Sequence, residues 1–266
     1  MGCNRETASY CFSPSAERLN YVETSFYGNS FGEKCLLLGV DGLESSPLSN
    51  TLKLNEILQL MSKFLQIHSQ NPESRSIKQV VEVLLQGGVI VYPTDSTYAL
   101  GCHIGDKAAL ERIRRIRQLD VKHNFTLVCS DLASISTYAQ VHNSAYRILK
   151  AYTPGPYTFV LKATAEVPKR LMHPKRKTIG LRVPDNAIAQ AIISTLGEPI
   201  MSTSLILPNE DEQLFDAYEM RLKLGKLVDM IVDGGAGGLE PTTMIDLVEG
   251  IPLVMREGKG DSSPFA

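Results

Sequence analysis

Polar side chains that could hold a charged ligand follow several apolar segments of this chain. The apolar residues 89–92, VIVY, run into a proline, a carboxylate and three hydroxyls at 93–97, with Thr94 and Asp95 directly after the proline. Ligands of α/β sheets collect where strands end and loops begin. Further polar residues lie beside the ends of apolar segments at Thr158, Arg182, Ser202 and Ser204. We therefore expect these side chains to share one binding surface.

The last part of the chain repeats this arrangement twice. Thr242 and Thr243 precede an apolar segment at 244–245, and Arg256 follows another at 253–255. The glycine-rich stretch 233–243, DGGAGGLEPTT, lacks the G-K-[ST] ending of a nucleotide P-loop and does not clearly open a helix. We interpret it as a flexible connection, and we count Thr242 and Arg256 among the candidate binding residues.

Four arginines, Arg112, Arg114, Arg115 and Arg117, cluster near the end of a helix that we expect Asp106 to cap. Positions 112 and 115 share one face of such a helix, as do 114 and 117, so the four side chains cannot all point one way. Two interpretations remain open. Either the cluster is a solvated helix end that complements the helix dipole, or its planar guanidinium groups hold phosphate oxygens in pairs. The basic residues between 169 and 177 are interpreted as a solvated loop.

The composition excludes several classes of protein. The formal net charge of -2 gives no overall affinity for polyanions, so any nucleotide or RNA binding must come from a local patch. The five cysteines form no C-x-x-C pair and the five histidines form no H-E-x-x-H motif, which argues against a disulfide framework and a metal site. The apolar runs are too short to span a bilayer. We expect a cytoplasmic protein with reduced thiols.

The periodicity of apolar residues predicts a mixed α/β sheet in one domain at 61–266. Residues 1–60 lack this pattern and are expected to be a poorly ordered extension, with Met61 as a possible alternative start. The expected strands are 64–67, 89–92, 125–129, 157–162, 179–183, 200–204, 230–232, 244–247 and 253–255. The expected helices carry apolar stripes beginning at Ile77, Leu110 and Ile188 or cover 144–151 and 217–224, and glycines at 87–88 and 197 end two of them.

Taken in order, these segments resemble the YrdC-like proteins, the threonylcarbamoyl-AMP synthases. VYPTDSTYALG resembles the family's P-T-[ED]-[ST]-x-Y/F-x-x-G segment, and RIRQ at 115–118 stands where the family has K-x-R. PGPYTFVLKA, TIGLRVPDN, MSTS, PTTMIDL and MREG match its later motifs in sequence order. RIRQL and HNFTL are similar to the YciO branch. The resemblance covers about 61–258.

This resemblance implies a twisted mixed sheet with helices around a large basic concave groove. It also implies a reaction that joins L-threonine, bicarbonate and ATP, with Mg²⁺, into threonylcarbamoyl-AMP and pyrophosphate for tRNA modification. Such chemistry needs charge neutralisation and alignment more than a protein nucleophile. An RNA- or nucleotide-binding relative without synthase activity, which would bind tRNA or double-stranded RNA, is the alternative. An adenylating enzyme with another acceptor also stays open.

Site residues follow from the resemblance position by position. Thr94 and Thr242 would hold polar groups of threonine, Asp95 would help to fix its loop, and Arg182 would pair with a carboxylate or a phosphate. The nucleotide would lie against Thr158, Ser202, Ser204 and Arg256. Arg115 and Arg117 would contact phosphates and serve as the catalytic residues, with Lys122 or His123 near a further basic position.

Two positions depart from the family pattern. Arg115 replaces a lysine, and a planar fork does not substitute atom for atom for a compact ammonium group. The family's S-x-N becomes Ser204-Leu205-Ile206, so an aliphatic side chain replaces an amide. Loss of such a hydrogen-bond partner costs roughly 1 to 3 kcal/mol. We expect this change to weaken or redirect the family reaction.

Overall fold

The computed structural model describes residues 62–120, 123, 125–208 and 214–265, which belong to one compact unit. The expected extension at 1–60 and the alternative start at Met61 lie outside these residues, as does Lys122. The helices of the described part are all too short or too polar to cross a membrane.

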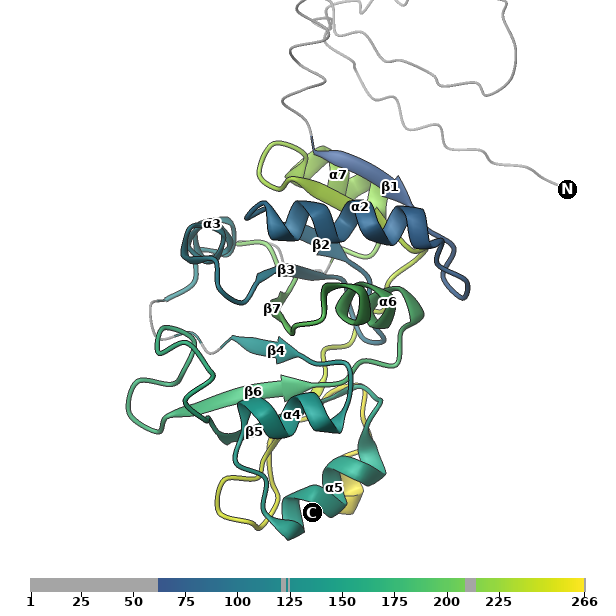
Figure 1. Cartoon of the computed structure of the whole chain (residues 1–266). Helices are drawn as coiled ribbons and strands as arrows, with labels where there is room; N and C mark the ends of the chain where they lie inside the picture. Colours follow the sequence, from purple (N-terminus) through teal and green to yellow (C-terminus); the bar gives the residue numbers. More distant parts are fainter. Residues whose placement is uncertain (1–61, 121–122, 124, 209–213, 266) are drawn as a thin grey trace, which may run out of the picture. The chain divides into compact units, whose positions relative to one another are not determined.

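A mixed sheet of ten strands organises the described residues, in the order β1-β8-β2-β3-β7-β4-β6-β5-β9-β10 (Figure 1). Four strand pairs are parallel (β1/β8, β2/β8, β4/β6 and β5/β9) and the others are antiparallel, which confirms the prediction of a mixed sheet. The strands are β1 Lys63–Gln66, β2 Ile90–Tyr92, β3 Ala99–His103, β4 Thr126–Val128, β5 Tyr157–Lys162, β6 Thr178–Arg182, β7 Ile200–Ser204, β8 Met230–Asp233, β9 Thr243–Asp246 and β10 Leu253–Arg256.

Capping residues explain where two of the helices begin or end. Asp106 caps α3 as expected, because its carboxylate accepts a hydrogen bond from the backbone N–H of Ala109 at 2.8 Å. Gly197 ends α6 with a left-handed φ of 77°, a conformation that costs glycine little. The helices are α2 Ser74–Leu85, α3 Lys107–Arg117, α4 Leu132–Tyr138, α5 Asn143–Tyr152, α6 Ala187–Leu196 and α7 Ala217–Leu224, followed by a 3₁₀ turn, η1 Ser263–Phe265.

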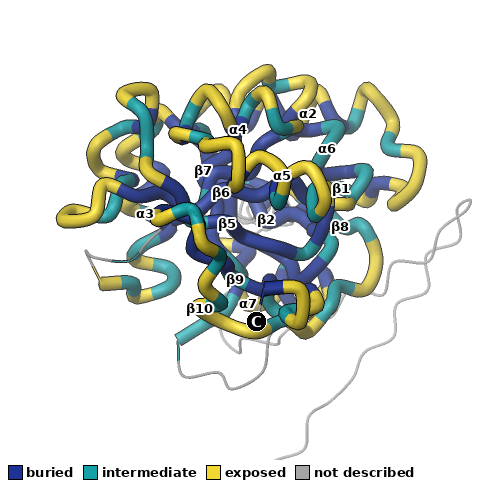
Figure 2. Tube along the Cα trace, turned by 90° about the horizontal axis from the view of Figure 1, so that it is seen from below, coloured by how far each residue is buried: buried dark blue, intermediate teal, exposed yellow. Residues whose placement is uncertain are grey.

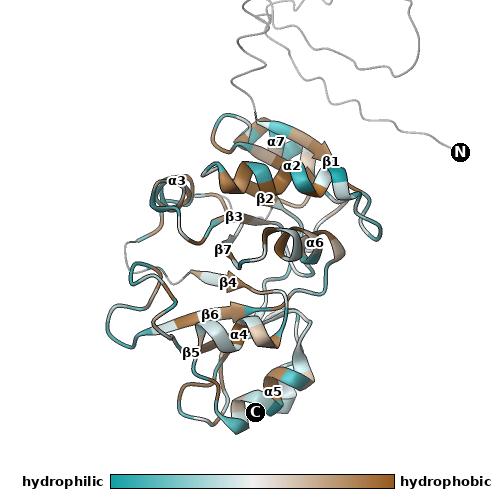
Figure 3. Ribbon diagram, viewed as in Figure 1, coloured by the Kyte–Doolittle hydropathy of each residue, from teal (hydrophilic) through white to brown (hydrophobic). Residues whose placement is uncertain are grey.

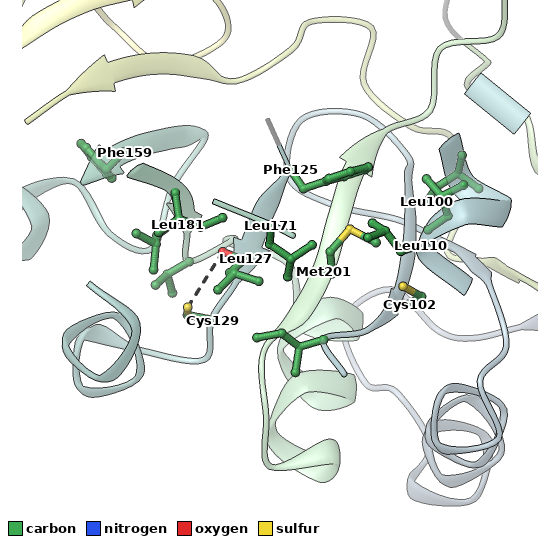
Figure 4. Close-up of a cluster of buried hydrophobic side chains, with 14 of the residues drawn as sticks. Leu100, Cys102, Leu110, Phe125, Leu127, Cys129, Phe159, Leu171, Leu181 and Met201 are labelled. Atoms are coloured by element: carbon green, nitrogen blue, oxygen red, sulfur yellow. Dashed lines mark hydrogen bonds between the residues drawn. The ribbon is translucent and has the colours of Figure 1, made fainter. Parts of the chain in front are cut away.

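Two hydrophobic clusters pack on the sheet. The smaller one joins α2 and α6 to β2, β8 and the adjoining ends of β4 and β7, and α2 alternates between hydrophobic and hydrophilic residues as a half-buried helix should (Figure 3). The larger one involves α3, α4, α5 and α7. Leu127, Leu181 and Met201 are register partners at its centre (Figure 4). Figure 2 shows most of the strands buried inside an exposed layer of helices and loops, whereas the edge strands β1 and β10 are half-buried or exposed.

Two elements were not predicted from the sequence, β3 and α4. The strand β3 has the sequence ALGCH, in which a glycine and a histidine interrupt the apolar pattern, and yet four of its five residues are buried. The helix α4, LASISTY, is rich in hydroxyl and β-branched residues that favour other conformations. Asp131 caps it by accepting from Ser134 N at 2.7 Å. Both elements form because tertiary packing outweighs weak local propensity.

Candidate functional site

A groove runs across one face of the sheet. Thr126 pairs with Ser202 on one side and with Gly180 on the other, so these three residues lie side by side on the same face. It is the face opposite to the core residues Leu127, Leu181 and Met201, because successive side chains of a strand alternate. The groove is lined by Thr97, Ala99, Arg117, His123, Thr126, Val128, Thr158, Arg182, Ser202, Thr203, Ser204, Ile206, Thr242, Met244 and Arg256.

Gly180 keeps the centre of this face free of side chains. A Cβ atom at this position would lie 3.0 Å from Thr126 Oγ1 and 3.3 Å from Thr158 Cγ2. Both distances are tighter than ordinary van der Waals contact, so a side chain here would press on two hydroxyl residues that line the groove. The glycine of TIGLR thus helps to keep room for a ligand.

Arg117 reaches one end of the groove from the last turn of α3. Its Nη1 donates to Thr203 Oγ1 at 2.9 Å and to the carbonyl oxygen of Ser204 at 2.5 Å. Burial lowers the pKa of Arg117 below its ordinary value, but an arginine stays protonated in proteins. The guanidinium group is therefore a fixed positive charge, held by the end of β7.

His123 lies beside this arginine. Its Nε2 is 3.4 Å from Thr203 Oγ1, and its ring meets the ring of Phe125 edge-on. Burial, together with the charges of Arg117 and Arg114, lowers the pKa of His123. The burial and the two positive charges thus favour the neutral imidazole.

Arg182 occupies the middle of the groove and is held from behind by the loop that follows β2. Its Nη2 forms an ion pair with the Asp95 carboxylate and lies 3.3 Å from Thr94 Oγ1. Asp95 also accepts from the backbone N–H of Asp185 at 3.1 Å, and Lys259 Nζ donates to the Asp95 carbonyl at 2.5 Å. Only 9% of the Arg182 and Asp95 side chains is exposed. This network fixes the direction of the Arg182 guanidinium group.

Thr158, Thr242 and Arg256 form the other end. The two threonine hydroxyls are 2.8 Å apart, and Arg256 Nη2 donates to the carbonyl oxygen of Thr242 at 2.8 Å. Burial, with a smaller contribution from the charge of Arg182, lowers the pKa of Arg256. Arg256 and Met244 are cross-strand partners on β10 and β9, which places a cation next to an apolar side chain.

The groove is suited to an anion. The part of its lining that the structure describes contains three arginines and no carboxylate. Seven of the residues expected from the sequence are brought together here: Arg117, Thr158, Arg182, Ser202, Ser204, Thr242 and Arg256. Thr94 and Asp95 lie one layer behind, where they contact Arg182 rather than line the groove.

Arg115 is not brought to the groove. It lies in a second pocket on the other side of α3, with Arg112, Lys223 and Lys226, and its Nε lies 3.4 Å from the carbonyl oxygen of Glu111. The arginine cluster thus divides between faces, as expected. Arg112 pairs with Asp229 at 2.8 Å and Arg114 stacks over the ring of Phe125.

Four lining residues lie outside the polar segments singled out from the sequence: Ala99, Thr126, Val128 and Met244. The alternation of side chains along a strand could have identified two of them, because Thr126 and Met244 take the groove-facing positions of their strands. Ile206, where the family carries asparagine, does line the groove. Of the two residues expected near a further basic position, His123 lines the groove, and Lys122 lies outside the described residues.

Comparison with known proteins identifies the family of this chain. The family model Sua5_yciO_yrdC, described as telomere recombination, matches residues 82–258. YciO of Escherichia coli is 58% identical over 205 residues, covering 77% of this chain and 100% of YciO. Its crystal structure superposes with a TM-score of 0.75 at 57% identity over the same shares of the two chains.

Two more distant relatives were found. A threonylcarbamoyl-AMP synthase of Vibrio vulnificus is 31% identical over 165 residues, or 61% of this chain and 88% of that enzyme. P. abyssi Sua5, solved with L-threonine, is 23% identical and superposes with a TM-score of 0.68 over 74% of this chain and 58% of Sua5, which shows a shared fold. This chain belongs to the Sua5/YciO/YrdC family.

Proposed function

We propose that the protein forms threonylcarbamoyl-AMP from L-threonine, bicarbonate and ATP, as a step toward threonylcarbamoyladenosine in tRNA. The observation that carries this proposal is the convergence of Arg117, Arg182 and Arg256 with hydroxyl side chains in one groove, whose described lining residues include no carboxylate. The relation to the V. vulnificus synthase and to Sua5, which was solved with L-threonine, supports it. The proposal places the protein in the cytoplasm, with its tRNA substrate.

The proposed reaction has two steps. The threonine amine first adds to the carbon of bicarbonate, with loss of water, to give a carbamate. A carbamate oxygen then attacks the α-phosphorus of ATP, the bond from that phosphorus to the bridging oxygen breaks, and pyrophosphate leaves with the electron pair. The negative charge on the phosphates and on the leaving group requires fixed positive charge around it.

Each end of the groove has a different part in this proposal. Arg117 would hold the phosphates, next to Ser202 and Ser204, while Arg256 and Thr158 would line the nucleotide. Arg182, aimed by Thr94 and Asp95, would pair with the threonine carboxylate or a phosphate beside Thr242. Fixed donors of this kind lower the barrier because they do not reorient during the reaction.

No protein nucleophile is part of the proposal. Of the thiols in the described part of the chain, Cys102 and Cys129 lie in the core on the opposite face of the sheet, and burial raises the pKa of each to about 12. A thiol with such a pKa is protonated and unreactive at neutral pH. The reacting oxygen is instead supplied by the substrate.

Magnesium fits this site as part of the nucleotide. Proteins usually hold Mg²⁺ with one or two carboxylates together with substrate phosphates, and the lining residues offer hydroxyl groups instead. Within the described residues there is also no cluster of three His, Cys, Asp or Glu side chains that could bind a metal. We therefore propose that the ion enters as Mg·ATP and supplies charge neutralisation at the phosphates.

A pyrophosphate-release assay tests this function. The protein is incubated with ATP, Mg²⁺ and bicarbonate, with and without L-threonine. Threonine-dependent release that is lost in Arg117→Ala and Thr94→Ala is expected. Release no greater than in these variants would contradict the proposal. Release that depends on another amino acid would point to an adenylating enzyme with a different acceptor.

A second candidate is a double-stranded RNA- or tRNA-binding protein without synthase activity. Two observations favour it: Ile206 stands where the family has an amide, and Arg112, Arg115, Lys223 and Lys226 surround the second pocket. Binding to RNA phosphates would weaken steeply with salt. Because Arg115 and Arg117 lie in different pockets, single substitutions separate the candidates. RNA binding lost in Arg115→Ala alone, with no adenylate formed by the unaltered protein, would favour the second candidate.

A further inference from the structure

His123 shares one hydroxyl group with Arg117. Arg117 Nη1 donates to Thr203 Oγ1 at 2.9 Å, and His123 Nε2 lies 3.4 Å from the same oxygen. A hydroxyl oxygen has two acceptor lone pairs and one hydrogen, so Thr203 Oγ1 can accept from the arginine and still either donate to His123 Nε2 or accept from it. The contacts thus link His123 to Arg117 through one hydroxyl group in either protonation state of the imidazole.

The charged side chains that shift the pKa of His123 are Arg117 and Arg114, both on α3 and both positive. The neighbouring groups are the neutral Thr203 of β7, the ring of Phe125 just before β4, and the backbone carbonyl of Asp120, which accepts from His123 N at 2.9 Å. No carboxylate is among the described residues that line the groove. The ordinary pKa of histidine, about 6.5, is lowered here by burial and by the two arginines.

A bound polyphosphate would raise the pKa of His123 again. An anion held by Arg117 would neutralise the charge that opposes protonation and would offer oxygen atoms that accept from an imidazolium N–H. A further observation points to a ligand at this place, since Arg117 Nε is buried and has no hydrogen-bond partner among the described residues. Arg117 and His123 both line the groove.

We propose that His123 binds a proton when a polyphosphate enters the groove, so that nucleotide binding is coupled to proton uptake. This inference rests on the proposed function for the identity of the ligand. The imidazole is neutral in the ligand-free protein and becomes a second cation beside Arg117 when phosphate oxygens arrive. Binding therefore strengthens as the pH falls through the interval between the lowered pKa of the free protein and the raised pKa of the complex.

Isothermal titration calorimetry of the full chain with Mg·ATP tests this coupling. Titrations at one pH in two buffers with different ionisation enthalpies give the number of protons taken up for each bound nucleotide. The comparison variant is His123→Gln, whose side-chain oxygen can still accept from Thr203 but does not titrate. The control is His103→Gln, because His103 pairs with Glu198 at 3.1 Å and is not among the residues that line the groove.

We expect the unaltered protein and His103→Gln to take up more protons than His123→Gln, by an amount approaching one. The apparent Kd of the unaltered protein should rise with pH by up to about 10-fold per unit relative to His123→Gln. Titration of the nucleotide itself contributes equally to all three proteins and cancels in the comparison. Equal proton uptake and parallel pH profiles, with Mg·ATP still bound, would overturn the coupling and leave the proposed function intact.

Inorganic pyrophosphate is the second probe, and it separates the two proposals. If Mg·ATP does not bind, the proposed function fails. In that case, pyrophosphate binding with His123-dependent proton uptake supports the coupling. The lack of such proton uptake overturns it. Should His123→Gln fail to fold in a thermal melt, the His123 ring is followed by proton NMR in the unaltered protein. A pKa that rises when pyrophosphate is added supports the coupling, and an unchanged pKa overturns it.

Discussion

Arg115 and Arg117 are two residues apart in one helix and meet different surroundings. Arg117 donates to Thr203 and Ser204 inside the groove, whereas Arg115 lies in the second pocket, next to the carbonyl of Glu111. A helix advances 100° per residue, so a separation of two places side chains on different sides. The proposed phosphate contact therefore depends on Arg117 much more than on Arg115.

Replacement of Arg117 by methionine should reduce nucleotide affinity and activity together. Methionine keeps much of the stem packing but removes the charge and both hydrogen bonds, and the loss of one such electrostatic contact typically costs on the order of 100-fold in rate. Steady-state kinetics and ATP titration measure the effect. Arg115→Met is the matched control and should stay within a few-fold of the unaltered protein. Equal losses in both variants would contradict this assignment.

Replacement of Ile206 by asparagine should raise the threonine-dependent activity. Ile206 lines the groove, and an amide there would restore a partner worth roughly 1 to 3 kcal/mol for a polar ligand atom. We expect a rate increase of roughly 10-fold, measured as pyrophosphate release. Ile206→Leu keeps the apolar character and should leave the rate unchanged. A lower rate in Ile206→Asn would show that the aliphatic side chain itself serves the ligand.

Most of the groove residues could be predicted because hydroxyls and arginines stand where apolar segments end. These segments do not predict which of the polar side chains line the groove and which lie behind its lining. Thr94 and Asp95 look equivalent to Thr158 in the sequence, but they turn behind Arg182 because Thr94 Oγ1 donates to the carbonyl of Thr97 at 2.5 Å. Such a local turn depends on the rest of the fold.

At the scale of elements, the apolar periodicity predicted most strands and helices within a residue or two. The strands at 157–162 and 200–204 have the predicted bounds. The strand β3 was not predicted because Gly101 interrupts its apolar pattern, but the packing of the sheet requires a glycine at this position. A Cβ atom there would lie 2.8 Å from both Ile200 Cγ2 and Tyr92 Cε1. The strand is thus specified by close packing against its neighbours rather than by its own composition.

The cap of α3 should contribute to stability and to the placement of Arg117. Asp106→Ala removes the hydrogen bond to Ala109 N, and losing an N-cap typically costs about 1 kcal/mol. We expect the free energy of unfolding in urea to fall by this amount, with no change in the m-value. Asp106→Asn, which can still cap the helix, should recover most of it. An unchanged midpoint in Asp106→Ala would mean that the cap does not stabilise the fold.

At the scale of the whole molecule, residues 61–266 should fold and act without residues 1–60. The E. coli YciO crystal structure covers 77% of this chain and 100% of its own, so a chain of that extent folds by itself. We expect a protein that begins at Met61 to unfold cooperatively, with the same midpoint and the same rate as the full chain. A lower midpoint or a lost activity would show that the extension contributes to the domain.

The most direct test of the proposed function is mass spectrometry of the products formed from ATP, Mg²⁺, ¹³C-bicarbonate and L-threonine. We expect an adenylate that contains threonine and one ¹³C atom, formed by the unaltered protein and by Arg115→Met and reduced on the order of 100-fold in Arg117→Met. The absence of this adenylate would contradict the proposed function, and its formation at the same rate in Arg117→Met would contradict the claim that Arg117 holds the phosphates for this reaction.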